Sequence, residues 1–275
     1  MQPNRVKSRY ESGELALGTY MTYPTARAAG PLAAAGLDFL RIDAYKFPWD
    51  YATMGDIVRT TSLLGMTPWA RVRHDAWEIG RMLDLGAHAL TVPGVSSAAE
   101  ARAIVAAAVN PPRGQREPSV PEGFGSYAEY DEWAADQLII GCQIETPEAI
   151  DNYREIISVP GVAVIHTGRN DIAGALGVPG EQFHPKVLDI ERRVIEATME
   201  AGKQPAMMFP LTEDGCDRAV QWIEQGVRIF ALDTDARVMQ RVFAAAAGSI
   251  RDRARAGADN SKTDNSKTGN RESAL

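Results

Sequence analysis

The sequence predicts an α/β fold in which eight parallel strands close into a (β/α)8 barrel, the TIM barrel. Apolar segments of strand length alternate with amphipathic helical segments from residue 15 almost to residue 256. Eight such units in about 250 residues match the usual size of this barrel. Several helical segments stop at a glycine, as helices before a strand commonly do. These glycines are Gly36, Gly65, Gly86, Gly202 and Gly226.

The expected strands are short apolar runs bounded by polar, glycine or proline residues. In chain order they span residues 15–21, 39–43, 67–72, 89–92, 138–144, 162–167, 205–209 and 228–232. The helical segments between them carry apolar residues at helical spacing, as Ile79, Met82 and Leu83 do. These segments span residues 25–35, 51–64, 76–85, 97–109, 147–157, 185–201, 213–224 and 236–256.

Two segments depart from the alternation. Residues 110–136 form a long connection rich in proline, glycine and aromatic residues, which predicts a lid or a subunit-contact loop. Residues 257–275 are polar and repeat an Asn-Ser-Lys-Thr element, which is typical of a disordered tail. The sequence therefore predicts one barrel domain over residues 1–256 and a C-terminal tail over residues 257–275.

The composition excludes several classes of partner. A formal net charge of -7 argues against a general nucleic-acid surface. No apolar run approaches the roughly 20 residues that a membrane span needs. Residues 1–14 are polar and lack the apolar core of a signal peptide, so a cytoplasmic protein is expected. The two cysteines, Cys142 and Cys216, suggest neither a disulfide framework nor a metal site.

Two carboxylates end successive strands. Glu145 closes the segment 138–145, and Asp171 follows the strand at 162–167, so both belong to the same rim of the barrel. Two hard oxygen ligands presented side by side indicate a divalent-cation site. The polar, glycine-containing loop at Asp171 adds backbone N–H groups that could hold an anion beside the metal. Alternatively, each carboxylate caps the helix behind it, since Thr146-Pro147-Glu148 reads as a helix start.

Other charged residues also lie at strand ends. Asp43 and Lys46 follow the second strand, and Arg71 and Arg73 end the third. In a (β/α)8 barrel the chemistry belongs to this rim. Among the four histidines only His74, just after the third strand, is a candidate for the site.

Several motifs resemble the HpcH/HpaI aldolase and citrate lyase family, particularly its metal-dependent pyruvate aldolases, and the similarity runs from about residue 15 to residue 244. The motifs are Gly36-Leu-Asp-Phe-Leu-Arg-Ile-Asp43, Leu83-Asp-Leu-Gly-Ala87 with Val92-Pro93, Asn110-Pro-Pro-Arg-Gly114, Gln143-Ile-Glu-Thr146, Gly168-Arg-Asn-Asp171 and Leu176-Gly-Val-Pro-Gly180. The resemblance implies a homo-oligomer, a trimer or hexamer, in which neighbours exchange the last helix.

The resemblance also implies a role for each strand-end residue. Glu145 and Asp171 would be ligands of Mg²⁺, Mn²⁺ or Co²⁺, and pyruvate would bind through its carboxylate and keto oxygens. Backbone amides near Asn170 and Asp171, in the segment that starts at Gly168, would hold the carboxylate. Arg71 would face the keto or enolate oxygen, with Arg73 as a competitor for that role. A metal and an arginine both stabilise the negative charge of an enolate.

One motif departs from the family pattern. The family usually carries Asp-x-Glu-His-Gly after the second strand, whereas this chain has Asp43-Ala-Tyr-Lys-Phe47, so Tyr45 replaces the glutamate and Lys46 the histidine. Asp84 matches the aspartate that pairs with that histidine, so a Lys46–Asp84 pair could handle protons. Lys46 could equally form an ordinary ion pair or bind an acidic substrate. Phe47 and the aromatic residue Trp49 make this rim bulkier.

The sequence thus predicts a metal-dependent carbon–carbon lyase of the aldolase type. It would act through the enolate of pyruvate or a related 2-oxo acid, with an aldehyde or acyl compound as the second substrate. One alternative is a lyase that uses Lys46 as a Schiff-base nucleophile, with the carboxylates structural. Another is a non-catalytic barrel that binds a 2-oxo acid. For Arg71, a salt bridge to a rim carboxylate is the alternative role.

Overall fold

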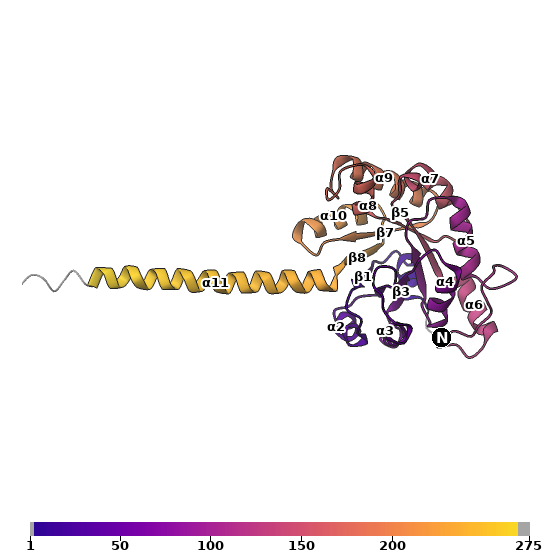
Figure 1. The fold of residues 1–275 in the computed structure, drawn as a ribbon, viewed down its shortest axis with the longest axis horizontal. Coiled ribbons are helices and arrows are strands. Elements are labelled where there is room, and N and C mark those ends of the chain that lie inside the picture. The colour runs from indigo at the N-terminus through magenta and orange to yellow at the C-terminus, as the bar shows by residue number, and fades with distance from the viewer. Residues whose placement is uncertain (1–2, 269–275) are drawn as a thin grey trace, which may run out of the picture. The chain divides into compact units, whose positions relative to one another are not determined.

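Eight parallel strands, β1 to β8, form a closed barrel in chain order in the computed structural model (Figure 1). The model describes the backbone of residues 3–268 and the side chains of residues 3–256. β8 pairs with β1 and closes the barrel, so the predicted (β/α)8 fold is confirmed. The strands are β1 (Ala16–Met21), β2 (Phe39–Asp43), β3 (Thr67–Arg71), β4 (Ala89–Val92), β5 (Ile139–Ile144), β6 (Val164–Thr167), β7 (Gln204–Phe209) and β8 (Ile229–Thr234).

Helices follow the strands on the outside of the barrel. Most begin at a serine, threonine or aspartate whose side chain accepts a backbone N–H of the first turn, as Asp50, Asp75 and Ser97 do. The helices of the barrel unit are α1 (Arg5–Glu11), the 3₁₀ turn η1 (Ala26–Ala28), α2 (Ala29–Ala34), α3 (Tyr51–Leu63), α4 (Ala76–Asp84), α5 (Ala98–Ala108), α6 (Tyr127–Gln137), α7 (Pro147–Ser158), α8 (Arg169–Ala175), α9 (Pro185–Glu200) and α10 (Glu213–Glu224).

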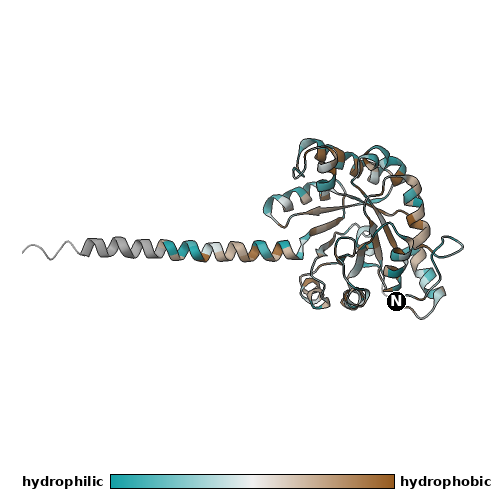
Figure 2. Ribbon diagram, in the orientation of Figure 1, coloured by the Kyte–Doolittle hydropathy of each residue, from teal (hydrophilic) through white to brown (hydrophobic). Residues whose placement is uncertain are grey.

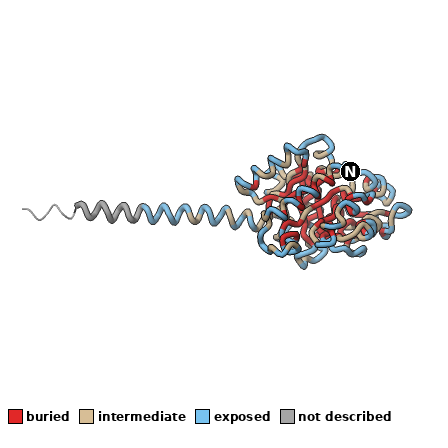
Figure 3. Tube along the Cα trace, turned by 90° about the horizontal axis from the view of Figure 1, so that it is seen from above, coloured by how far each residue is buried: buried red, intermediate tan, exposed pale blue. Residues whose placement is uncertain are grey.

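The barrel buries side chains on both faces of its sheet, and the apolar strands gather at the centre of the fold (Figures 2 and 3). Leu40 and Ile42 point outward and pack with helix residues such as Ile79. Phe39 and Trp69 point inward and form an apolar interior cluster near the N-terminal ends of the strands. Because side chains alternate along a strand, the polar residues further along the same strands also face the interior.

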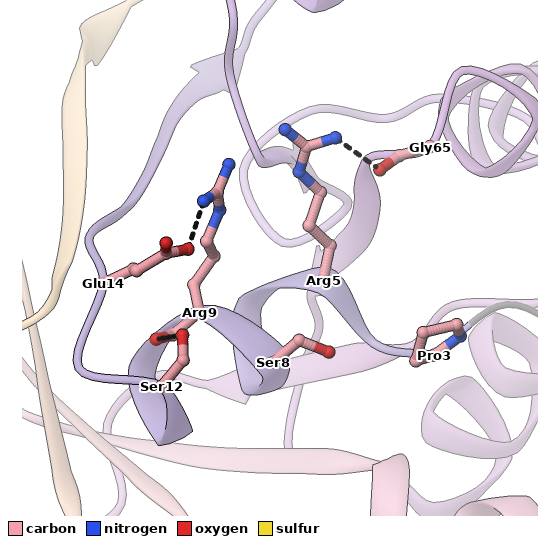
Figure 4. A pocket seen from close by; sticks show the side chains of 7 residues that line it. All are labelled: Pro3, Arg5, Ser8, Arg9, Ser12, Glu14 and Gly65. Atoms are coloured by element: carbon pink, nitrogen blue, oxygen red, sulfur yellow. Dashed lines mark hydrogen bonds and ion pairs between the residues drawn. The ribbon is translucent and has the colours of Figure 1, made fainter.

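Helix α1 lies at the N-terminal end of the barrel, and the sequence did not predict it. Its residue Val6 is buried and donates its backbone N–H to Thr67 at the start of β3. Arg5 and Arg9 both donate through Nε to Oδ1 of the buried Asp38, at 2.6 Å and 3.1 Å. Figure 4 shows these two arginines beside a surface hollow, where Arg9 also pairs with Glu14.

The long connection at residues 110–136 also lies at the N-terminal end of the barrel. It leaves the end of α5 and returns through α6 to the start of β5, where Gln137 accepts the backbone N–H of Asn4. The segment therefore cannot be a lid over the C-terminal ends of the strands, and the predicted lid is wrong. It contains a full helix, α6, whose Tyr130 and Trp133 pack with Phe124. The subunit-contact role stays a prediction.

The chain beyond Thr234 forms a separate unit, and its described residues form one helix, α11 (Asp235–Thr268). The helix runs past residue 256, so residues 257–268 are helical where a disordered tail was expected; residues 269–275 lie outside the described residues. The division into a barrel domain and a tail stays a prediction. Within the described part of the chain, no helix has the length and apolar character that a membrane crossing requires.

His88 gives the stability of the fold a testable pH dependence. Its ring lies 4.6 Å from that of Trp133, and burial lowers its pKa to about 4. Because the unfolded chain binds a proton near pH 6.5 and the folded chain does not, stability falls as the pH drops below 6.5. Between pH 7 and pH 5 this group should cost about 2 kcal/mol. Calorimetry should show that the free energy of unfolding falls less between pH 7 and pH 5 in His88→Gln than in the wild type. An equal fall in both proteins would contradict a lowered pKa of His88.

Candidate functional site

Glu145 and Asp171 lie next to each other at the C-terminal rim of the barrel. β5 and β6 are paired up to Ile144 and Thr167, so the residues that follow these two strands emerge side by side. Burial and the neighbouring Asp171 carboxylate raise the pKa of Glu145 to about 7. The two carboxylates are thus close enough to repel each other, as the sequence predicted for a cation site.

Neighbouring polar groups hold the Glu145 carboxylate in place. Gln143 donates its side-chain amide to Oε2, and the backbone N–H of Gly94 also hydrogen-bonds the carboxylate. A Cβ at Gly168 would lie 2.4 Å from Glu145 Oε2, so glycine is required there. Thr146, not Glu145, caps α7 by accepting the N–H of Ala149 at 3.1 Å. The capping role considered for Glu145 is therefore not observed.

A buried ion pair fixes the start of α8, where Asn170 and Asp171 are exposed. Arg169 donates through Nε to Oε1 of the buried Glu191 at 2.8 Å. The same oxygen accepts the hydroxyl of Thr167, the last residue of β6, at 2.9 Å. One carboxylate on α9 thus ties the end of β6 to the first turn of α8. Asn170 and Asp171 therefore extend from a rigid base.

Arg71 and Asp43 form a second buried ion pair at this rim. Arg71 donates Nε to Oδ1 at 3.0 Å and Nη2 to Oδ2 at 2.5 Å, a bidentate geometry that fixes the guanidinium plane. Its charge opposes the rise in the pKa of Glu145, so it lies close to the carboxylates. Arg73 is 67% exposed and lies 3.8 Å from Glu78. Of the two candidate arginines, the structure places Arg71 at the site.

Lys46 lies at the site, but Asp84 does not. The Lys46 ammonium also opposes the rise in the pKa of Glu145, and its backbone N–H donates to Asp43. Asp84 ends α4, a helix that runs back from β3 to the N-terminal end of β4. There it accepts hydrogen bonds from Arg116, at 2.6 Å, and from Ser119. The structure therefore does not bring Lys46 and Asp84 together, because α4 carries Asp84 to the opposite end of the barrel.

A polar network fills the barrel interior below the carboxylates, and the sequence did not reveal it. The fully buried Arg41 contacts Tyr20 Oη and lies 3.2 Å from His166 Nδ1, while burial lowers the pKa of the guanidinium to about 10. Burial, with Arg41 and Arg71 nearby, holds the pKa of His166 well below its usual range. Nδ1 therefore accepts from Arg41, and Nε2 donates to Thr91 Oγ1 at 2.9 Å.

The strand alternation could have revealed this network. Phe39, Arg41 and Asp43 occupy alternate positions of β2, so all three face the interior. His166 is a structural member of this network. His74 is exposed just after β3.

The site fits a divalent cation of the Mg²⁺ type. In the described part of the chain no group of three or more histidine, cysteine or acidic side chains could enclose a metal. Glu145 and Asp171 offer two carboxylates instead, and the missing Cβ of Gly168 lets the Glu145 carboxylate pack against the backbone at the start of α8. Mg²⁺ is commonly bound by one or two carboxylates and completes its shell with water or substrate.

Comparison with known proteins identifies the family. The family model of the HpcH/HpaI aldolase/citrate lyase family matches residues 67–239. The chain belongs to this family. It is 34% identical over 188 residues to a hydroxypyruvate/pyruvate aldolase of Sagittula stellata, covering 67% of this chain and 74% of the relative. It is 30% identical over 251 residues to a 4-hydroxy-2-oxovalerate aldolase of Rhodococcus jostii, covering 89% and 95%.

A solved structure agrees with this assignment. The HpcH/HpaI aldolase of Desulfitobacterium hafniense matches with a TM-score of 0.83 at 25% identity, covering 90% of this chain and 96% of that one. The resemblance found in the sequence is confirmed, and so is the prediction of a carbon–carbon lyase of the aldolase type.

The buried Asp43–Arg71 pair should matter more for stability than an exposed pair. Asp43→Asn leaves a buried guanidinium without its charge partner and should destabilise the fold by roughly 3 kcal/mol. Asp56→Asn makes the same change in the exposed Arg59–Asp56 pair and should cost less than about 1 kcal/mol. Urea unfolding of both variants measures the difference. Equal losses would show that Arg71 does not depend on Asp43.

Proposed function

We propose that this protein is a metal-dependent aldolase that acts through the enolate of pyruvate or a related 2-oxo acid. The main support for this proposal is the pair of adjacent carboxylates, Glu145 and Asp171, beside the fixed guanidinium of Arg71. These carboxylates would hold Mg²⁺, Mn²⁺ or Co²⁺, which would supply Lewis-acid stabilisation of enolate charge. The second substrate would be an aldehyde or acyl compound, in line with the aldolase relatives named above.

The binding groups of this proposal come from two sides of the rim. Arg71, oriented by Asp43, would face the keto oxygen of the 2-oxo acid and stabilise the negative charge that develops there. Backbone N–H groups around Asn170 and Asp171, next to Gly168, would hold the substrate carboxylate. Arg169 and Glu191 would keep that segment rigid, since they anchor α8.

Lys46 keeps three possible roles in this proposal: an acid or base, an ion-pair partner, or a group that binds an acidic substrate. Asp84 is not proposed to assist it within one chain, because Asp84 pairs with Arg116 at the other end of the barrel. A Schiff-base mechanism through Lys46 is the alternative chemistry. It predicts trapping of pyruvate on Lys46 by borohydride in the presence of EDTA.

Deuterium exchange into the methyl group of pyruvate tests the proposed function directly. Proton NMR would follow the methyl signal with protein treated with EDTA and with protein reloaded with Mg²⁺ or Mn²⁺. We expect exchange only after reloading, because formation of the enolate requires removal of a methyl proton. Exchange that persists in EDTA, together with borohydride trapping on Lys46, would support the Schiff-base lyase. Absence of exchange under every condition would support a binding-only barrel.

A glycine substitution tests the metal ligands without removing any carboxylate. In Gly168→Ala the new methyl group would lie 2.4 Å from Glu145 Oε2 and 2.8 Å from Gln143 Nε2, so Glu145 must move. We expect Mn²⁺ affinity, measured by calorimetry, to fall about 10- to 100-fold. Gly174→Ala is the matched control, because no atom lies within 4 Å of its added Cβ. Unchanged Mn²⁺ affinity in Gly168→Ala would contradict the assignment of Glu145.

We also propose that the protein forms a homo-oligomer, a trimer or a hexamer. On α11, taken by itself, Met239, Val242, Phe243 and Ile250 follow one another at the spacing of one helix face. A helix with such a face is stabilised when it packs against another surface. Sedimentation velocity would measure the oligomeric state. The cytoplasmic location expected from the sequence stays a prediction.

A further inference from the structure

Exposed aromatic side chains gather beside the site, in the segments that follow β2 and β3. Tyr45 is 41% exposed, Tyr51 37% and Trp77 59%. Tyr51 and Trp77 meet edge to face at 5.6 Å, and Phe47 stacks on Trp49 at 5.7 Å. These five residues form the aromatic rim. Large aromatic side chains left exposed together commonly mark a binding surface.

The aromatic rim is continuous with the carboxylate site. The Tyr45 ring lies 5.5 Å from Cζ of Arg71, within the range of a cation–π contact. Arg71 is in turn held by Asp43. Lys46, the next residue after Tyr45, carries its charge close enough to influence Glu145. A molecule bound at Glu145 and Arg71 therefore has Tyr45, one member of the aromatic rim, as its neighbour.

In the part of the chain that the structure describes, one positive charge at the aromatic rim has no acidic partner in an ion pair. Within the described residues, Lys46 forms no ion pair with a carboxylate. Three acids of these segments have other partners: Asp43 binds Arg71, while Asp50 and Asp75 cap α3 and α4, each accepting a backbone N–H at 2.9 Å. An ammonium without a partner beside exposed aromatic rings suits a ligand that carries both an aromatic ring and an anionic group.

We propose that the aldehyde partner of this enzyme is an aromatic aldehyde that carries a carboxylate. Its ring would stack on Tyr45 and the Phe47–Trp49 pair, and its carboxylate would pair with Lys46. This inference rests on the proposed function, because the aldehyde must meet the enolate of the 2-oxo acid.

The reaction balances without a further reactant. The methyl carbon of pyruvate loses a proton and bonds to the aldehyde carbon, and the aldehyde oxygen takes up a proton to become a hydroxyl group. Cleavage of the product runs through the same steps in reverse.

The test compares three aldehydes with pyruvate and Mn²⁺: 4-carboxybenzaldehyde, benzaldehyde and butanal. We expect kcat/KM to fall in that order, by about tenfold at each step. Tyr45→Leu should reduce the ratio of benzaldehyde to butanal. Lys46→Met should reduce the ratio of kcat/KM for 4-carboxybenzaldehyde to that for benzaldehyde. Lys46→Arg keeps the positive charge and should leave this ratio close to that of the wild type. Tyr127→Leu, on α6 at the opposite end of the barrel, should change neither ratio.

Three outcomes would overturn the inference, and they differ in what they say about the proposed function. If pyruvate exchanges its methyl protons but the three aldehydes react equally, the aromatic rim does not select the substrate and the proposed function stands. The same holds if Tyr45→Leu changes the oligomeric state and leaves both ratios unchanged, since the aromatic rim is then a subunit contact. If no exchange occurs with any metal, the proposed function and this inference both fail.

Discussion

The closure of eight parallel strands directs alternate side chains of every strand into one interior, and the site depends on this constraint. The inward positions change from apolar to charged along the strands, as Phe39, Arg41 and Asp43 do along β2. The apolar end provides the stability of burial. The charged end has to be satisfied by partners within the same narrow space, which is why it contains paired and networked groups rather than isolated charges.

The C-terminal end of the barrel contains one pair of opposite charges and one pair of like charges. Asp43 neutralises Arg71, whereas Glu145 lies beside a second carboxylate and has a pKa of about 7. A like-charged pair in which Glu145 is half-buried is unfavourable for the protein alone, and a bound cation removes the cost. Below it, Arg41 contacts Tyr20 and His166 without a carboxylate partner of its own. The protein thus keeps unfavourable electrostatic interactions at the rim where ligands are expected.

Most of the fold could be predicted from the sequence, because all eight strands and their helices follow simple hydrophobic periodicities. Helices α1, α6 and α8 could not. The few buried side chains of α1 and α6 serve contacts at the end of the barrel, and α8 has only seven residues. Glu145 and Asp171 were predictable from their positions at strand ends. Within one chain, Lys46 and Asp84 lie apart because α4 carries Asp84 away from the rim of Glu145, a direction that motif spacing does not show. The sequence left both Arg71 and Arg73 as candidates, and only their surroundings in the structure distinguish them.

The central claim is that Glu145 and Asp171 bind one divalent cation together with a 2-oxo acid. Anomalous scattering from crystals grown with Mn²⁺ and oxalate, an unreactive bidentate analogue, tests it most directly. We expect one anomalous peak between the two carboxylates, about 2 Å from an oxygen of each, with oxalate bound near Arg71. A peak elsewhere, or oxalate bound at Lys46 without metal, would contradict it.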